Sequence, residues 1–364
     1  MAGQKSPVLR AKDEQAAAQA LAAAGKTDGL PVVVPTPQRV EEMLLHAPNL
    51  PPQAVLGSLL PAGGELTVEK AAINAVMAGC PVETFPWVIA ACEAICDPRF
   101  DLGPLQSTTH CVTPLVIVNG PSRYHYGFTS GVQALGPGQR ANATLGRTLR
   151  LIMLNVGGGA PGVGDMATLG SPAKFTCCLA EAEEENPYDP LHVALGFDAA
   201  DDVVTVIGVE GPHSLIFTLE DFEGNEEALL RTLGAGIANP ASNNIYFGNS
   251  AVVAMLNPFH MRILSRKGLS YRDIQQRLYN YASVERKVFE SIVGLQNANM
   301  SPQTGERLHA VRRPEDFLLL VAGQEGGAYS VYFPSWGGGV AGQHPVSKKV
   351  RLDDGCEIPA SIRR

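Results

Sequence analysis

Short, uniformly apolar runs that end in glycine, asparagine or proline constrain this chain more than any other feature. Residues 115–118, 203–208 and 251–256 are such runs, and segments with helical spacing of alanine and leucine separate them. A strand that is apolar at every position is usually buried on both faces, which is typical of α/β proteins. The sequence therefore predicts an α/β fold with mixed sheets and packed helices.

Two of these strands are followed by similar segments. Residues 116–121 and 253–258 each end in asparagine and proline, and each leads into a histidine-bearing segment. This similarity predicts two degenerate α/β halves. We expect an N-terminal arm at 1–30, a first half with an anion-binding segment at 31–200, and a second half at 201–364. The arm is expected to be partly helical and to be ordered by a partner subunit.

Other local signals predict where elements begin and end. Thr36 and Pro37 predict a helix at 38–45, Gly79 predicts the end of a helix at 67–79, and Ser270 predicts a helix at 271–281. Asn142 is expected to be the N-cap of a helix at 142–156, and 225–237 is expected to be helical. A C-terminal hairpin is expected from strands at 316–323 and 328–333 with a turn at 324–327.

Charge and cysteine content exclude several classes of protein. The 364 residues carry 36 acidic and 28 basic side chains, a net charge of −8, and no basic stripe interleaved with aromatics, so nucleic acid is not an expected partner. The alanine-rich stretch 15–24 is too short to span a bilayer and lacks the features of a signal peptide. We therefore expect no membrane partner and a cytoplasmic location. The seven cysteines are an odd number and favour reduced thiols over a disulfide framework.

The segment from Thr108 to Arg150 carries the candidate substrate-binding residues. A helix N-terminus offers free amides, and Arg140 beside Asn142 could clamp a carboxylate or phosphate at two points. The full candidate set is Arg140, Asn142, Thr144, Asn119 and Thr109. The alternative interpretation is a capped helix with a surface arginine.

Three histidines beside the predicted strands are candidate catalytic residues. His110 precedes a strand, whereas His213 and His260 follow strands, where α/β enzymes often carry their chemistry. We expect His110 and His213 to transfer protons in a lyase-like enzyme that acts on a small anionic metabolite, with Glu69 and Lys70 as supporting charges. The alternatives are that each histidine bonds a loop backbone and that Glu69 and Lys70 form a solvated first helical turn.

A metal-dependent hydrolase is a further alternative, because imidazoles together with Glu210 suit zinc or iron. The sequence contains no His-x-x-x-His pair to support it, and it leaves both the metal and any cofactor undetermined. Residues 157–162 match a dinucleotide-binding pattern but follow a helix, so we reject that interpretation. Cys177 and Cys178 are expected on opposite faces of a strand at 174–180, as buried thiols or with one facing the site.

Five segments, residues 68–80, 108–110, 118–121, 140–144 and 210–213, resemble a poorly characterised bacterial family associated with small companion proteins that carry a UGSC motif, cysteine or selenocysteine followed by Gly-Ser-Cys. The resemblance implies a two-component thiol or selenol redox enzyme in which this chain forms the pocket. We expect a homo-oligomer or, as the resemblance implies, a complex with a small thiol-bearing companion protein. This chain lacks the Cys-Gly-Ser-Cys motif and has Gly-Ala-Tyr-Ser at 327–330, where a Gly-Lys-His-Ser type of ending is expected.

Overall fold

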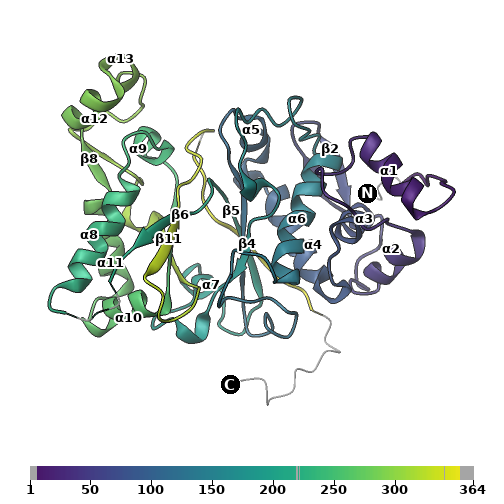
Figure 1. Cartoon of the computed structure of the whole chain (residues 1–364), viewed down its shortest axis with the longest axis horizontal. Helices are drawn as coiled ribbons and strands as arrows, with labels where there is room; N and C mark the ends of the chain where they lie inside the picture. Colours follow the sequence, from purple (N-terminus) through teal and green to yellow (C-terminus); the bar gives the residue numbers. More distant parts are fainter. Residues whose placement is uncertain (1–5, 219, 221, 340, 353–364) are drawn as a thin grey trace.

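Two four-stranded sheets lie face to face between two layers of helices in the part of the chain that the computed structural model describes, residues 6–218, 220, 222–339 and 341–352 (Figure 1). In spatial order, the first sheet contains β12 (Val346–Lys349), β5 (Val203–Val209), β3 (Thr113–Asn119) and β4 (Cys178–Ala180). The second contains β10 (Phe317–Val321), β7 (Val252–Leu256), β11 (Tyr329–Phe333) and β6 (His213–Ile216). The predicted α/β class with mixed sheets and packed helices is confirmed.

The two sheets share one pattern of strand directions. In the first sheet, β3 is parallel to β4 and antiparallel to β5, which is antiparallel to β12. In the second, β7 is parallel to β10 and antiparallel to β11, which is antiparallel to β6. This common topology is what two related halves would produce.

The halves exchange their last strands. β5 leads through residues 210–212 into β6, which joins the second sheet, and β11 leads through Pro334 into β12, which joins the first. The two crossing segments are paired at Val209 and Ser335, and the Glu210 amide donates to the Pro334 carbonyl at 2.8 Å. The expected boundary at residue 201 therefore does not separate the sheets, because β5 and β12 both belong to the first one.

The predicted C-terminal hairpin is wrong in its pairing. Both strands exist as β10 and β11, but β7 lies between them and pairs with each. The connection at 322–328 is long enough to pass over one strand, since this requires about 10 Å, two interstrand spacings. The turn signal in the sequence is compatible with either arrangement.

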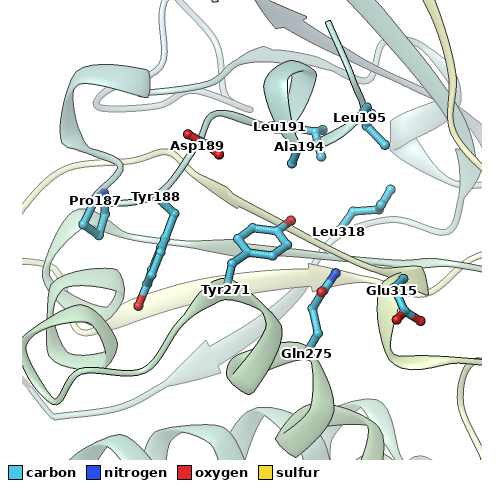
Figure 2. A pocket seen from close by; sticks show the side chains of 10 residues that line it. All are labelled: Pro187, Tyr188, Asp189, Leu191, Ala194, Leu195, Tyr271, Gln275, Glu315 and Leu318. Carbon is cyan, nitrogen blue, oxygen red and sulfur yellow. The ribbon is translucent and has the colours of Figure 1, made fainter.

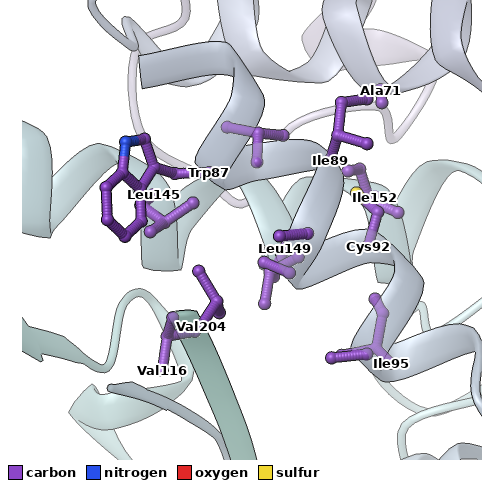
Figure 3. Close-up of a cluster of buried hydrophobic side chains, with 14 of the residues drawn as sticks. Ala71, Trp87, Ile89, Cys92, Ile95, Val116, Leu145, Leu149, Ile152 and Val204 are labelled. Carbon is purple, nitrogen blue, oxygen red and sulfur yellow. The ribbon is translucent and has the colours of Figure 1, made fainter. Parts of the chain in front are cut away.

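Three clusters of buried side chains hold the layers together. Leu115, Ile207, Val253 and other residues fill the space between the sheets. On the outer face of the first sheet, Val116 and Val204 contact the helical layer through residues such as Leu149 (Figure 3). The outer face of the second sheet has its own cluster against α8 (Asn225–Ile237), α10 (Pro258–Arg266) and α11 (Tyr271–Tyr281). Cys177 belongs to the inter-sheet cluster and Cys178 to the first outer cluster, so they lie on opposite sides of the sheet as expected, but the predicted strand at 174–180 begins only at Cys178.

Several helices begin or end where cap residues predict. The helices of the first layer are α2 (Pro37–Leu44), α3 (Val68–Ala78), α4 (Phe85–Cys96) and α6 (Arg140–Asn155), and those of the second are α8 (Asn225–Ile237), α10 (Pro258–Arg266) and α11 (Tyr271–Tyr281). Thr36 caps α2, Ser270 forms a capping box on α11, and Gly79 ends α3 in the left-handed conformation. Asn142 as an N-cap is wrong, because α6 begins at Arg140 and Asn142 lies within its first turn.

Shorter elements connect and flank these layers. The helices are α1 (Glu14–Ala23), α5 (Leu102–Ser107), α7 (Leu191–Ala194), α9 (Asn243–Phe247), α12 (Arg286–Val293) and α13 (Leu295–Ala298). β1 (Val55–Leu59) pairs with β2 (Gly64–Thr67), and β8 (Ser283–Glu285) pairs with β9 (Arg307–His309). None of the described helices is long and apolar enough to cross a membrane.

The described part of the N-terminal arm packs on its own chain. Arg147 donates to both carboxylate oxygens of Asp28, at 2.8 and 2.9 Å, and Asn155 donates to the Lys26 carbonyl. Leu21 packs against a small buried cluster on α3 and α6. The described part of the arm is partly helical, as predicted, and these contacts hold it on α3 and α6; its ordering by a partner subunit stays a prediction.

Candidate functional site

One carboxylate brings together two of the predicted catalytic histidines. The Nε2 atom of His110 lies 3.2 Å from Oε1 of Glu210, and the Nε2 atom of His213 lies 3.5 Å from Oε2. The side chain of Glu210 is 17% exposed, that of His110 21% and that of His213 41%, so the cluster is partly open to solvent. We call these three residues the His–Glu–His cluster.

The exchange of strands places this cluster. Glu210 lies where β5 crosses toward the second sheet, and His213 is the first residue of β6. His110 lies just before β3, and the antiparallel register of Thr113 with Val209 brings the start of β3 to the end of β5. The amide of His110 also donates to the Thr108 hydroxyl at 3.2 Å, which fixes the turn that carries the imidazole.

Two further residues complete the surroundings, and the sequence analysis did not identify either as functional. The Asn243 amide nitrogen lies 3.2 Å from Nδ1 of His110, and the Tyr332 ring lies 5.2 Å from the ring of His213. When His110 is neutral, a proton on Nε2 bonds Glu210 and leaves Nδ1 to accept from Asn243. The only sequence signal for Asn243 was a polar turn before a strand, which does not reveal its distant partner.

Glu210 remains a carboxylate in this arrangement. Burial raises its pKa, but the hydrogen bond and the charge of His110, together with those of His213, lower it further, so the net shift is downward. An ionised Glu210 orients both imidazoles and stabilises positive charge on either of them. Such a group suits proton transfer in which one imidazole accepts a proton while the other donates one.

The loop at residues 157–176 borders the cluster. Its Thr168 amide donates to the carbonyl of Thr109 at 2.9 Å, so the exposed Thr109 contacts this loop through its backbone. The Ser171 hydroxyl lies 3.4 Å from the position that a Cβ atom on Gly211 would take. The loop therefore touches both chain segments that carry the histidines and Glu210.

A charged triad anchors the same loop. The Asp165 carboxylate accepts from Lys174 at 2.7 Å and from Arg150 at 3.0 Å, and all three side chains are mostly buried. Burial raises the pKa of Asp165, but the two cations lower it by more, so the carboxylate stays ionised. Two positive charges against one negative charge leave the triad with an excess of one positive charge.

Glu69 and Lys70 lie outside the cluster and have structural partners. The Glu69 carboxylate accepts from the Ser6 amide at 2.8 Å, and the Lys70 ammonium donates to the Glu65 carbonyl at 2.5 Å. These bonds hold the N-terminal arm and β2 to α3. The geometry thus favours the structural interpretation of this pair, because neither side chain is brought to the histidines.

The expected anion clamp is also built differently. Arg140 donates from Nε to the Gly79 carbonyl at 3.0 Å, and the Thr144 hydroxyl donates to the Arg140 carbonyl. Asn142 is buried, and its side chain accepts from the Thr129 amide and donates to the Thr129 and Ala134 carbonyls. Asn142 therefore holds the preceding loop on α6, and its polar atoms are occupied by the chain itself.

His260 and Asn119 lie in two other buried polar clusters. His260 is fully buried, its Nδ1 lies 2.7 Å from the Ser330 hydroxyl, and burial lowers its pKa. The Asn119 amide donates to Glu181 at 2.7 Å and to Glu183 at 3.0 Å. Burial raises the pKa of Glu181 to about 7. Neither cluster contributes to the His–Glu–His cluster.

The arrangement of possible metal ligands and the burial of the cysteines bear on the metal and thiol alternatives. Within the described parts of the chain, no group of three or more His, Cys, Asp or Glu side chains is arranged to hold a metal ion. Cys177 and Cys178 are buried thiols, and burial raises the pKa of Cys177 to about 12. This environment favours the structural interpretation of both thiols. Cys356 lies outside the described residues.

No protein-family model, curated protein or solved structure matches this chain. The resemblance to the family with UGSC-motif companions therefore stays a prediction. What the site does has to be inferred from its own geometry and charge.

Proposed function

We propose that this chain is an enzyme that acts on a small anionic metabolite by general acid–base chemistry of the lyase type, with His110 and His213 as its proton-transfer groups. The observation that carries the proposal is a pair of partly exposed imidazoles, His110 and His213, whose Nε2 atoms lie 3.2 and 3.5 Å from the two carboxylate oxygens of Glu210. One imidazole removes a proton from the substrate, the other protonates the leaving group, and Glu210 keeps both oriented.

The charge of the neighbouring triad supports an anionic substrate. Lys174 and Arg150 outweigh Asp165 by one positive charge, and they anchor the loop that touches both histidine segments. In this proposal the triad takes over the role that the sequence analysis gave to Arg140. A net positive charge on the loop that borders the cluster raises the local concentration of anions.

The direct test is hydrogen–deuterium exchange on carbon. The purified chain is incubated in D2O with a panel of small 2-hydroxy-, 2-amino- and phospho-carboxylates, and proton NMR follows loss of the signal next to the carboxylate. For any substrate that exchanges or is cleaved, His110→Gln and His213→Gln should each lower the rate by about 10²–10⁴-fold. His46→Gln, on a histidine at the end of α2, is the matched control and should keep the wild-type rate.

Full activity in both site variants would refute the proposal, as would activity that appears only after a thiol-bearing companion protein is added. The second result would favour the two-component redox interpretation. The anion-binding role has its own test, because Lys174→Met should raise KM by about tenfold and leave kcat unchanged if Lys174 contributes only to binding. Lys70→Met is the control, and an effect confined to Lys70 would contradict the assignment.

A further inference from the structure

A cavity of about 690 Å³ lies between α7, α11 and the edge strand β10, away from the elements that carry the His–Glu–His cluster (Figure 2). This volume falls in the range of small-molecule sites. Nothing in the proposed acid–base chemistry uses its residues.

Two tyrosine rings form one side of the cavity. Tyr188 and Tyr271 meet edge to face, with centroids 6.2 Å apart, and the apolar side chains of Leu191 and Leu318 line the opposite part (Figure 2). Both hydroxyls are already engaged, since Tyr188 donates to the Leu269 carbonyl at 2.7 Å and Tyr271 to the Leu319 carbonyl at 3.3 Å. The tyrosines therefore offer aromatic surface to a ligand and not hydrogen-bond donors.

The remaining polar side chains of the cavity offer acceptors. Among the described residues, the Asp189 carboxylate has no hydrogen-bond or ion-pair partner, and Glu315 has only Arg272, at 3.5 Å, whose side chain is 85% exposed. Gln275 is 7% exposed and donates from Nε2 to the Phe317 carbonyl, so its Oε1 atom remains free to accept. Figure 2 shows Asp189 and Glu315 at opposite ends of the cavity, with Gln275 between Tyr271 and Glu315.

The buried Glu181 adds negative charge to this environment only when it is ionised, because burial raises its pKa to about 7. Its carboxylate accepts a hydrogen bond from the backbone amide of Leu191, which lines the cavity. Its charge also contributes to raising the pKa of Tyr271 above the ordinary value. Burial of the Tyr271 ring is the larger cause of that shift. An anion in the cavity would face like charges from several directions.

The edge of β10 is not available to a peptide. The Tyr271 hydroxyl accepts from the Leu319 amide at 3.0 Å, and Gln275 occupies the Phe317 carbonyl. These side chains occupy the backbone groups to which an added strand would bond. The occupant is therefore better sought among small molecules.

From these observations we infer that the cavity binds a small organic cation, an amine or guanidinium joined to an aromatic or aliphatic body. The charged end would donate hydrogen bonds at one end of the cavity, either to Asp189 or to Glu315 with the neighbouring Gln275, and the body would pack on the tyrosine rings and the leucines. Cation–π attraction to Tyr188 or Tyr271 adds to the binding. This inference does not depend on the function proposed for the His–Glu–His cluster.

Isothermal titration calorimetry of the whole chain tests the inference with four probes. Phenethylammonium and benzyltrimethylammonium carry the expected charge, phenethyl alcohol is the neutral analogue, and 3-phenylpropionate is the anionic one. We expect saturable binding of a cation at one site in the millimolar range or tighter, and no comparable binding of the other two. The affinity should fall with added salt, because the two carboxylates are partly exposed.

The double variant Asp189→Asn, Glu315→Gln should weaken binding of the cation by about fivefold or more. Glu41→Gln, Glu42→Gln removes the same charge from the exposed face of α2 and should change nothing. The inference is overturned if neither cation binds by about 10 mM, if phenethyl alcohol or 3-phenylpropionate binds as tightly as phenethylammonium, or if both double variants bind it like wild type.

Discussion

Replacement of Gly120 by alanine should destabilise the protein for two separable reasons. Gly120 follows β3 with a φ of +112°, a conformation that residues with a Cβ atom rarely adopt. A Cβ atom there would also lie 2.5 Å from the Cα atom of Asp202 and 2.6 Å from the carbonyl oxygen of Asp201. Because both contacts are to backbone, rotation of a side chain cannot relieve them.

The expected magnitude follows from these two costs. Backbone strain at such a φ costs about 1–2 kcal/mol. Displacing a packed backbone costs about 1–3 kcal/mol more. A shift of Asp202 would also strain the 2.9 Å bond that its carboxylate accepts from the Ser122 amide. We therefore expect the Gly120→Ala variant to lose about 2–5 kcal/mol of unfolding free energy.

Gly138→Ala is the matched control. Gly138 has a φ of +106°, but a Cβ atom there would meet no other atom within 4 Å. It should therefore show the backbone strain alone, about 1–2 kcal/mol. Urea unfolding followed by tryptophan fluorescence gives both values from the midpoint and the slope. If the two variants agree within about 0.5 kcal/mol, the close approach of Asp202 does not constrain this turn and the reasoning is refuted.

Three other outcomes are expected. The Asp28→Asn variant should lose about 2–4 kcal/mol of unfolding free energy at neutral pH, because the mostly buried guanidinium of Arg147 then has no carboxylate partner at residue 28. Burial raises the pKa of Asp28, but Arg147 lowers it by more. The ion pair therefore stabilises the fold above the ordinary carboxylate pKa, and this stabilisation is lost as the pH falls through the pKa of the folded state. The urea midpoints of wild type and variant should converge on acidification. The Glu210→Gln variant should lose about 1–2 kcal/mol of unfolding free energy at pH 6. This difference from wild type should shrink on acidification, because the pKa of Glu210 is lowered in the fold, and a difference that does not change with pH would contradict an ionised Glu210. Cys177→Ser and Cys178→Ser should leave the fast phase of thiol labelling of the native protein unchanged, because burial raises both thiol pKa values, and loss of that phase in either variant would show an accessible thiol.

Local chemistry in the sequence was enough to locate many elements. Ser270 with Asp273 forms the capping box of α11, and Thr36 with Pro37 starts α2, because these caps depend on residues within one turn. The apolar runs at β3, β5 and β7 were found for the same reason, since burial on both faces requires apolar residues at successive positions. His110, His213 and Glu210 were also identified from their positions beside these runs.

The sequence did not reveal which strands pair or which side chains meet. β10 and β11 are adjacent in sequence and looked like a hairpin, yet β7 lies between them. Arg140 and Asn142 looked like a clamp for a ligand, yet the Asn142 side chain bonds Thr129 and Ala134, and the Nε atom of Arg140 bonds the Gly79 carbonyl. Such bonds cannot be read from residue type, because an amide or guanidinium serves a loop and a ligand equally well.

The sequence by itself determined several helices, the buried strands β3, β5 and β7, the α/β class and the residue types available for proton transfer. The tertiary structure alone decided that β6 and β12 are exchanged between the two sheets and that Glu210 lies close to both His110 and His213. The physical reason is that caps and periodicity depend on neighbours along the chain. Val206 pairs with Val346, which lies far away along the chain. Such pairing depends on how the apolar faces of all elements are buried together, and the local sequence of an apolar strand does not specify its partner.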